Sequence, residues 1–443
     1  MATGRLRSFG LFFVLNALLL PFAGAQTQDL LQVWTKAVER DPILAAAEAN
    51  RAAQSEKTPQ ARALLLPYIT ASTGVETDDI RSTSLDQSST DNRAVWALTL
   101  TQPIIDVGLW DTYRASEYIT QSATLAVQQA WQDLTLRVTQ AYFNVLAAQD
   151  TLKSLDAQKQ AIMNQLDAAK RGFELGSATI ADTYEAQARL DLINAGEIQA
   201  FNALQLAQDA LAGIISERPA ELARLQSTVS LPPPQPARLD DWTTQAAQAS
   251  LEVAQAELST RLAEKQIHIA QSEHYPTVDF YAQSGSSSDR GTFGPRAGPR
   301  SVETTVGVQL SIPLFAGGGI SSRVREQTSL LQKARYELES TRRQAVQATQ
   351  AFFSGVVSGL ARVSALQAAE ASSRASLEAN QTGYEVGVRV NIDVLNAQQQ
   401  LYETQRALAD ARYATLLNGL RLKAAGGILT ADDIIAINSL LAP

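Results

Sequence analysis

"GFELGSATIAD", residues 172–182, places two glycines four positions apart, directly after a run of 63 residues, 109–171, that contains neither glycine nor proline. The same pattern returns as "GYEVGVRVNID" at residues 383–393, which is 211 positions later. Glycine commonly follows the last turn of a helix, because it adopts the left-handed backbone conformation without a steric penalty. Both segments therefore predict a turn at the end of a long helix, at matching places in two halves of the chain.

The rest of the chain repeats with a similar offset. "LLPYITAS" around Pro67 corresponds to "HYPTVDFYAQS" around Pro276, and "LTQPIIDVG" corresponds to "LSIPLFAGG", at offsets of 209 to 210 residues. Between the halves lies "LPPPQP", whose prolines favour a stiff, extended linker. We therefore divide the chain into a first structural repeat (26–230), a Pro-rich linker (231–239), a second structural repeat (240–425) and a C-terminal tail (426–443).

The N-terminus has the features of an export signal. Arg5 and Arg7 precede the apolar run "FGLFFVLNALLLPF", and small residues follow at Ala23-Gly24-Ala25. We expect a signal peptide at 1–25, with Gln26 as the new N-terminus. No further run of about 18 apolar residues follows, so a transmembrane helix is not expected.

Composition argues against several functional classes. The chain has no cysteine, which excludes disulfides and thiolate metal sites, and its net charge of −8 argues against a nucleic-acid partner. The two histidines, His268 and His274, have neither a cysteine partner nor metalloprotease spacing, so we interpret them as surface or interface residues. With no nucleotide-binding or nucleophile motif, the sequence predicts no enzyme, no cofactor and no resident metal.

Within each half the hydrophobic period changes twice. Residues 30–64 and 240–273 are Ala-rich, and each segment is expected to form one helix. Each helix is followed by a β-hairpin, expected at about 65–103 and 275–313. The clearest strand has apolar residues at every second position from Val302 to Ile312. The polar segments between the strands of each pair, 76–93 and 284–301, predict long solvated loops.

After each hairpin the sequence has helical periodicity as far as the next turn. Long helices are expected at 109–171 and 320–382, with shorter returning helices at 179–216 and 391–425. At 1.5 Å per residue the first would extend roughly 95 Å. Apolar residues alternately three and four positions apart predict a coiled-coil seam along this helix. Lys159 is the one charged residue at a seam position. The seam positions are Leu134, Val138, Ala141, Val145, Ala148, Leu152, Leu155, Lys159, Ile162 and Leu166.

Four strands cannot close a membrane barrel alone. Open sheet edges would leave unpaired backbone groups in hydrocarbon, and the smallest barrels have about eight strands. The four predicted strands leave two interpretations open. They form either a small soluble sheet on a helical protein, or part of a sheet that is shared between copies of the chain.

Several strings add a family resemblance. They are "AYFNVLAAQDTL" (141–152), "GFELGSATIADTYEAQARLD" (172–191), "GYEVGVRVNIDVLNAQQQLYETQRALADARY" (383–413) and "LNGLRLKAAGGILTADDIIAINSLLAP" (417–443). Together with the order of elements, they resemble the TolC family of outer-membrane efflux and type I secretion ducts, over essentially the whole mature chain. The resemblance implies a mainly α fold in a homotrimer. Each chain would give long coiled-coil helices to an α-barrel and four strands to a shared 12-stranded transmembrane β-barrel.

The same resemblance implies a function. The trimer would lie in the outer membrane, among its lipids, and extend into the periplasm. It would export small molecules or proteins received from an inner-membrane RND, ABC or MFS transporter through a periplasmic adaptor protein. The alternative is a secreted or periplasmic coiled-coil structural or adaptor protein without a pore.

The repeated turns carry the expected site residues. By the resemblance, Tyr384 and Arg389 form a gate latch that closes the pore, with Asp182 as their acceptor. The family usually has threonine before that aspartate, where this chain has Ala181. The alternative is that Arg389 pairs with Asp393 four residues on, as an ordinary surface helix pair.

Asp393 matches a position whose three copies form an acidic ring at the pore constriction. Three carboxylates around a threefold axis lower the potential for cations and can bind one. The family commonly has a second aspartate three residues later, and this chain has Asn396. At the tips themselves, the resemblance implies adaptor docking at Gly176, Ser177, Gly387 and Val388, which can also serve as helix caps.

Overall fold

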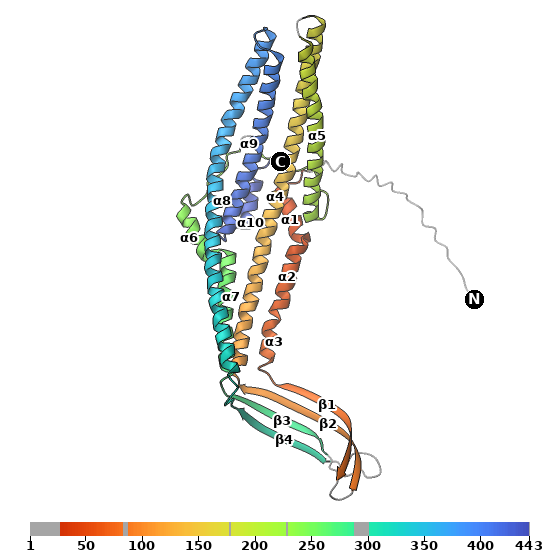
Figure 1. Ribbon diagram of the computed structural model, residues 1–443, viewed down its shortest axis with the longest axis vertical. Coiled ribbons are helices and arrows are strands. Elements are labelled where there is room, and N and C mark those ends of the chain that lie inside the picture. The colour runs from red at the N-terminus through yellow and green to blue at the C-terminus, as the bar shows by residue number, and fades with distance from the viewer. Residues whose placement is uncertain (1–26, 83–86, 177–178, 227–228, 288–300, 443) are drawn as a thin grey trace, which may run out of the picture.

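The computed structural model describes residues 27–82, 87–176, 179–226, 229–287 and 301–442. The expected signal peptide, Ser177 and most of the second hairpin loop lie outside these residues. The described chain is elongated, with a four-stranded sheet at one end and two helical hairpins that reach toward the other (Figure 1). It is mainly helical, as the sequence predicts.

Two long helical hairpins form most of the molecule. Helix α4 (Val107–Glu174) returns as α5 (Ile180–Ile215), and α8 (Gly319–Glu385) returns as α9 (Asn391–Ala425). The four helices expected from the period are thereby confirmed, with ends that differ by a few residues.

The seam of α4 is buried as its spacing predicts. Leu134, Val138 and Val145 are fully buried, and Ile162 packs with residues of α5 and α9 nearer the tip. The exception, Lys159, places its Nζ 2.6 Å from Oε2 of Glu197 on α5. Lys159, the charged residue of the seam, therefore forms an ion pair that links the two helices of the hairpin.

The expectation of one helix over 30–64 is wrong. Three helices occupy this region, because Asp41 leaves the helical conformation before Pro42 and accepts a 2.8 Å hydrogen bond from the amide of Leu44. A second break falls at Glu56. The three are α1 (Leu30–Arg40), α2 (Pro42–Ser55) and α3 (Lys57–Ala63).

The helix expected over 240–273 is also divided. Ser250, fully buried, caps the second part by accepting a hydrogen bond from the amide of Val253 at 3.2 Å. The two parts are α6 (Leu239–Ala249) and α7 (Leu251–Ser272). Each break lets short helices follow the surface of the long ones.

A partly buried ion pair joins the start of α2 to α4. The guanidinium of Arg137 donates to both carboxylate oxygens of Asp41, at 3.0 and 3.2 Å. Burial acts to raise the pKa of Asp41, but the hydrogen bonds and charge of Arg137, with the amide of Leu44, outweigh it and the net pKa is lowered. Because the folded pKa is depressed, the pair stabilises the fold at neutral pH, and this contribution is lost as the pH falls through that pKa.

The main core lies at mid-height, where the short helices meet α4, α5 and α9. Tyr142 is fully buried there and donates to the carbonyl of Ala223 at 2.7 Å. The C-terminal tail contributes α10 (Ala431–Asn438), whose Ile434 and Ile437 are buried in the same cluster. The tail is thus part of the folded core.

The four strands form one antiparallel sheet in chain order. β1 (Tyr68–Ser82) pairs with β2 (Gln87–Ile105), and β3 (Thr277–Ser287) pairs with β4 (Ser301–Ser311). Strands β2 and β3 join the hairpins of the two halves, which leaves β1 and β4 as the sheet edges.

The expected long loop at 76–93 is wrong, since both strands continue through most of it. Thr77 donates to Asn92 across the ladder at 2.9 Å, and Thr90 donates to Asp79 at 3.4 Å. Polar residues can continue a strand when their side chains bond to those of the neighbouring strand and both faces of the sheet contact water. Because such a strand has no apolar face, its composition resembles that of a loop.

The two faces of the sheet differ in chemistry. One presents exposed apolar side chains, 45–72% accessible, and the other presents mainly polar ones. The exposed apolar side chains include Ile69, Val75, Trp96, Leu98, Val306, Val308 and Leu310.

Among the described helices, one is long and apolar enough by composition to cross a membrane. It is α8, whose most apolar 18-residue window has a mean hydropathy of 1.2 and is 11% buried. This helix packs along α7 and α9, and length and composition alone are weak evidence for a membrane span.

Candidate functional site at the helical tips

Each helical hairpin turns on a left-handed glycine. Gly176 has φ +77° and Gly387 has φ +79°, a backbone conformation that residues with a Cβ atom rarely adopt. The amide of Gly176 donates to the carbonyl of Phe173, and that of Gly387 to Tyr384, at 3.0 and 3.1 Å. The repeated motif is therefore a helix C-cap at both tips.

Asp182 begins the returning helix of the first hairpin. Its Oδ2 accepts from the amide and the hydroxyl of Thr179, both at 2.8 Å, while the Thr179 hydroxyl accepts from the amide of Asp182 at 3.3 Å. This reciprocal capping box engages Oδ2 of the carboxylate that the family resemblance assigns to the latch. The latch role of Asp182 stays a prediction.

Arg389 folds back over the end of α8. A Cβ at Gly383 would lie 2.6 Å from its Cγ, so the glycine leaves room for the arginine side chain. Nη1 of Arg389 lies 3.8 Å from Oδ2 of Asp393, and the side chain is 58% exposed. Tyr384 is half-buried. Within one chain Arg389 thus meets Asp393, so a latch to Asp182 needs a rearrangement or a neighbouring copy.

Asp393 lies in the first turn of α9. Its Oδ2 accepts from the amide of Val390 at 3.4 Å, and the side chain remains 35% exposed. A carboxylate in the first turn is favoured by the helix dipole. Asp393 can therefore cap its own helix and still face an open space.

Sequence reasoning missed Asn391, which links the two hairpins. It is 1% exposed, accepts from Nε2 of Gln165 on α4, and donates to the carbonyl of Asp182 on α5 at 3.3 Å. Two residues after Asp393, Leu395 packs with Ile162 and other apolar residues of α4 and α5. An asparagine at the start of a helix resembles a simple cap, which concealed this role.

Asn396, one turn into α9, meets the first hairpin as well. Its Oδ1 accepts from Nη2 of Arg189 on α5 at 2.9 Å, and Nη1 of the same guanidinium donates to Oε1 of Gln399. The position where the sequence suggested a missing second carboxylate ring is therefore occupied by an amide that contacts α5.

The tips expose apolar side chains. Leu175 is 83% exposed, Val386 68% and Val388 76%. Large apolar side chains exposed at adjacent turns provide a surface that another protein can cover. Of the four expected docking residues, Gly176, Gly387 and Val388 lie here, and Ser177 lies outside the described residues.

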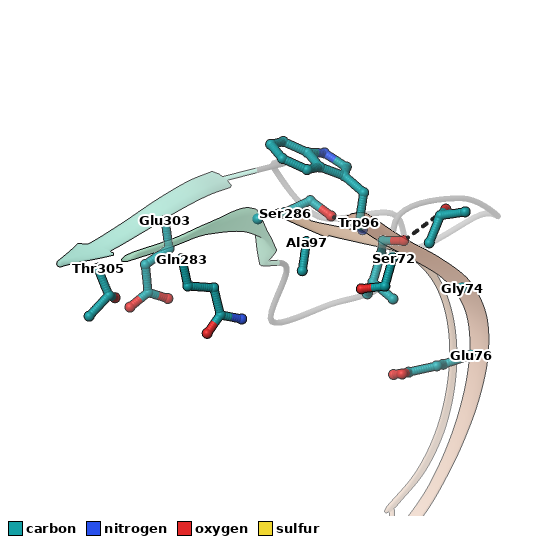
Figure 2. Close-up of a pocket in the computed structure, with 12 residues that line it drawn as sticks. Ser72, Gly74, Glu76, Trp96, Ala97, Gln283, Ser286, Glu303 and Thr305 are labelled. Carbon is teal, nitrogen blue, oxygen red and sulfur yellow. Dashed lines mark hydrogen bonds between the residues drawn. The ribbon is translucent and has the colours of Figure 1, made fainter. Parts of the chain in front are cut away.

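The far end of the molecule carries a polar hollow. On the concave face of the sheet, Glu76, Gln283, Glu303 and Thr305 lie around a space of about 560 Å³, while Trp96 points to the opposite face (Figure 2). This arrangement fits a sheet that is wet on one side and apolar on the other.

Over the described residues, no group of three or more histidine, cysteine, aspartate or glutamate side chains is arranged to hold a metal ion. His268 and His274 are both exposed. A cation site built from Asp393 would therefore need carboxylates from several copies.

The sequence pattern of the family described as outer membrane efflux protein matches residues 33–217 and 242–427. Outer membrane protein TolC of Escherichia coli K12 is 34% identical over 428 residues, covering 94% of this chain and 86% of the relative. The alkaline protease secretion protein AprF of Pseudomonas aeruginosa is 30% identical, covering 94% and 88%.

Solved structures share the fold at lower identity. The outer membrane protein VceC of Vibrio cholerae superposes with a TM-score of 0.77 at 18% identity, covering 90% of this chain and 96% of that one. The CmeC outer membrane channel of Campylobacter jejuni gives a TM-score of 0.78 at 16% identity, with coverages of 93% and 89%.

Proposed function

The chain belongs to the outer membrane efflux protein family, and from this premise we propose that three copies form one exit channel gated at the helical tips. Proteins of this family are outer-membrane channels and not enzymes. The trimer, the gate and the partners below are our proposal, and each rests on a separate feature of the chain.

The observation that carries the proposal is the two-faced sheet with open edges. Its exposed apolar face suits lipid, but β1 and β4 have free edges that hydrocarbon does not tolerate. Three copies of four strands close a ring without edges and exceed the minimum of about eight strands. A trimer thus satisfies the backbone of every strand.

The proposed gate lies where the hairpins turn. Tyr384 and Arg389 on the second hairpin would tether it to Asp182 on the first hairpin, in the same chain or its neighbour. The exposure of Arg389 and the marginal distance to Asp393 support this, because a weakly held guanidinium is available for another carboxylate. Ala181, which has no hydroxyl, leaves such a latch one hydrogen bond short.

Below the latch, three copies of Asp393 would form an acidic ring at the constriction. The ring would attract and bind a cation through the summed field of its carboxylates. Asn396 adds no charge to it, so we propose a single ring with weaker cation block than two rings would give.

The remaining proposals concern partners. The exposed apolar tips would dock a periplasmic adaptor around Gly176, Ser177, Gly387 and Val388, and the adaptor would connect to an RND, ABC or MFS transporter that supplies the energy. Relatives are named for protease secretion and for efflux, so we propose proteins, small molecules or both as cargo.

Planar-bilayer recordings test the gate. We expect wild-type trimers to show low conductance, and Arg389→Ala or Tyr384→Phe to raise it several-fold, because the closed hairpins lose a tether. Arg374→Ala is the matched control, since Arg374 is a 65% exposed arginine of α8 that, over the described part of the chain, pairs with Glu370 one turn away. A wide-open wild-type pore that is indifferent to both changes would contradict the latch.

The docking surface has its own prediction. A bulky residue at Gly176, such as Gly176→Trp, is expected to abolish adaptor binding and efflux while trimers remain in the outer membrane. The measurement is co-purification of the adaptor with the cross-linked protein, together with drug accumulation in cells. Gly213→Trp is the control, because Gly213 also has open space around it but lies at the far end of α5. Efflux unchanged by Gly176→Trp would rule out docking at this tip.

A coiled-coil protein without a pore fits the observations less well. Such a protein has no use for a sheet with one apolar and one polar face. Cell fractionation distinguishes the two, since the channel gives heat-modifiable trimers in the outer membrane.

A further inference from the structure

The two hairpins of one chain touch near their tips through a small set of side chains. Helices α5 and α9 share a much smaller contact there than either shares with its own hairpin partner. The apolar part is Leu395, 1% exposed among residues of α4 and α5. The polar parts are Asn391 and, one turn further along α9, the contact with Arg189.

Arg189 spans two acceptors with one planar group. Nη2 donates to Oδ1 of Asn396 at 2.9 Å, and Nη1 donates to Oε1 of Gln399. The two acceptors are three residues apart and so lie on one face of α9. A guanidinium fork matches such a pair, whereas the single ammonium of a lysine does not.

The acceptors are held ready for this contact. Nε2 of Gln399 donates to Oε1 of Glu403 at 2.7 Å, which fixes the amide so that its oxygen faces Arg189. Over the described residues, the hydrogen-bond acceptors of the Arg189 guanidinium are both amide oxygens. The contact is therefore a charged donor on two neutral acceptors.

We propose that Arg189 is a second latch, which holds the closed gate by clasping Asn396 and Gln399 of the same chain. It rests on the proposed gating function and adds to it a residue of the first hairpin outside the repeated turn. Tyr384 and Arg389 act at the turn itself, and Arg189 acts two helical turns below it.

Neutral acceptors suit a latch that must release. The attraction of a charge to an amide dipole falls more steeply with distance than its attraction to another charge, which at physiological salt is felt over about 8 Å. A hydrogen bond to an amide is thus lost within a small displacement. A carboxylate at position 396 would keep pulling the hairpins together after they separate.

Labelling of one introduced cysteine tests the clasp without reference to conduction. The chain has no cysteine, so Leu395→Cys provides a unique thiol that is buried until the hairpins part. In the assembled protein in detergent, we expect Arg189→Ala or Gln399→Ala to raise its maleimide labelling rate about tenfold, the effect of losing one charged hydrogen bond. Asn396→Asp is expected to slow labelling below that of the parent.

Two controls accompany the labelling. Arg374→Ala should leave the rate at position 395 unchanged, and a cysteine at the 76% exposed Val388 should label equally fast in every background. Arg189→Lys should label nearly as fast as Arg189→Ala, since the ammonium cannot span both acceptors. An arginine that made no contact with position 396 would not give opposite effects at the two positions.

Bilayer recordings then separate the two proposals. Raised conductance in Arg189→Ala, with the conductance of Arg374→Ala unchanged, supports the clasp. If Arg389→Ala opens the pore but Arg189→Ala changes neither conductance nor labelling, the clasp is wrong and the gate stands. If no variant conducts while labelling still responds to Arg189, then Arg189 holds the two hairpins together, but the gating proposal is wrong and Arg189 is not a latch.

Discussion

Gly427→Ala is expected to destabilise each chain by about 2–5 kcal/mol, although it adds one methyl group. Gly427 has φ +72°, which costs a residue with a Cβ about 1–2 kcal/mol. Its Cβ would also overlap the carbonyl oxygen of Ala249 and lie 3.0 Å from the carbonyl carbon. Such overpacking adds about 1–3 kcal/mol.

The neighbours of Gly427 are unable to move aside. The clashing atoms are backbone at the junction of α6 and α7, where the fully buried Ser250 caps the second helix. Thermal unfolding of the purified protein measures the effect. Gly176→Ala is the matched control, because Gly176 has nearly the same φ, +77°, but nothing within 4 Å. Equal losses of stability in the two variants would show that backbone strain alone acts at Gly427.

The long helices and their turns could be predicted because their signals are local and repeat. An apolar residue every three or four positions fixes the buried face of α4, and a glycine after it ends the helix. The breaks at Asp41 and Ser250 also carry local signals, a capping side chain and, at the first, a following proline. They were missed because the Ala-rich composition on both sides suggested one continuous helix.

Contacts between the halves could not be predicted in this way. Arg189 and Asn396 are 207 residues apart, and neither stands out on its own helix. Hydrophobic periodicity tells which face of a helix is buried but not which side chain of another helix lies against it. The latch expected at Asp182 depends in addition on how neighbouring copies meet.

A signal that could have been used is "GVVSG", residues 355–359. Glycines four apart mark a helix face that allows close approach. In the structure Gly359 lies against Thr415 of α9, whose Cβ would be 3.2 Å from an added Cβ, and Gly355 lies against Asn418. The spacing indicated a tight helix contact, although not its partner.

Val306→Arg is expected to remove the protein from the outer membrane, whereas Thr305→Arg is expected to leave it there. Val306 is 61% exposed on the apolar face and belongs to a row across the sheet, opposite Ala282 in β3. The row continues through Leu100 and Ile69 of the first hairpin. An arginine facing lipid at the bilayer midplane costs about 2–4 kcal/mol, and a trimer would bear this three times.

Thr305, the residue next to Val306, is a closely matched control. Thr305 shares the strand and its hydrogen-bond ladder with Val306, but it faces the polar hollow beside Glu303 and Gln283 (Figure 2). There an arginine stays in water near a carboxylate, so heat-modifiable trimers should still appear in the outer-membrane fraction. Loss of both variants would point to a general defect of the strand, and retention of both would mean that the apolar face does not meet lipid. Only the opposite behaviour of two neighbouring positions follows from a sheet with one face in the bilayer and the other toward a water-filled lumen.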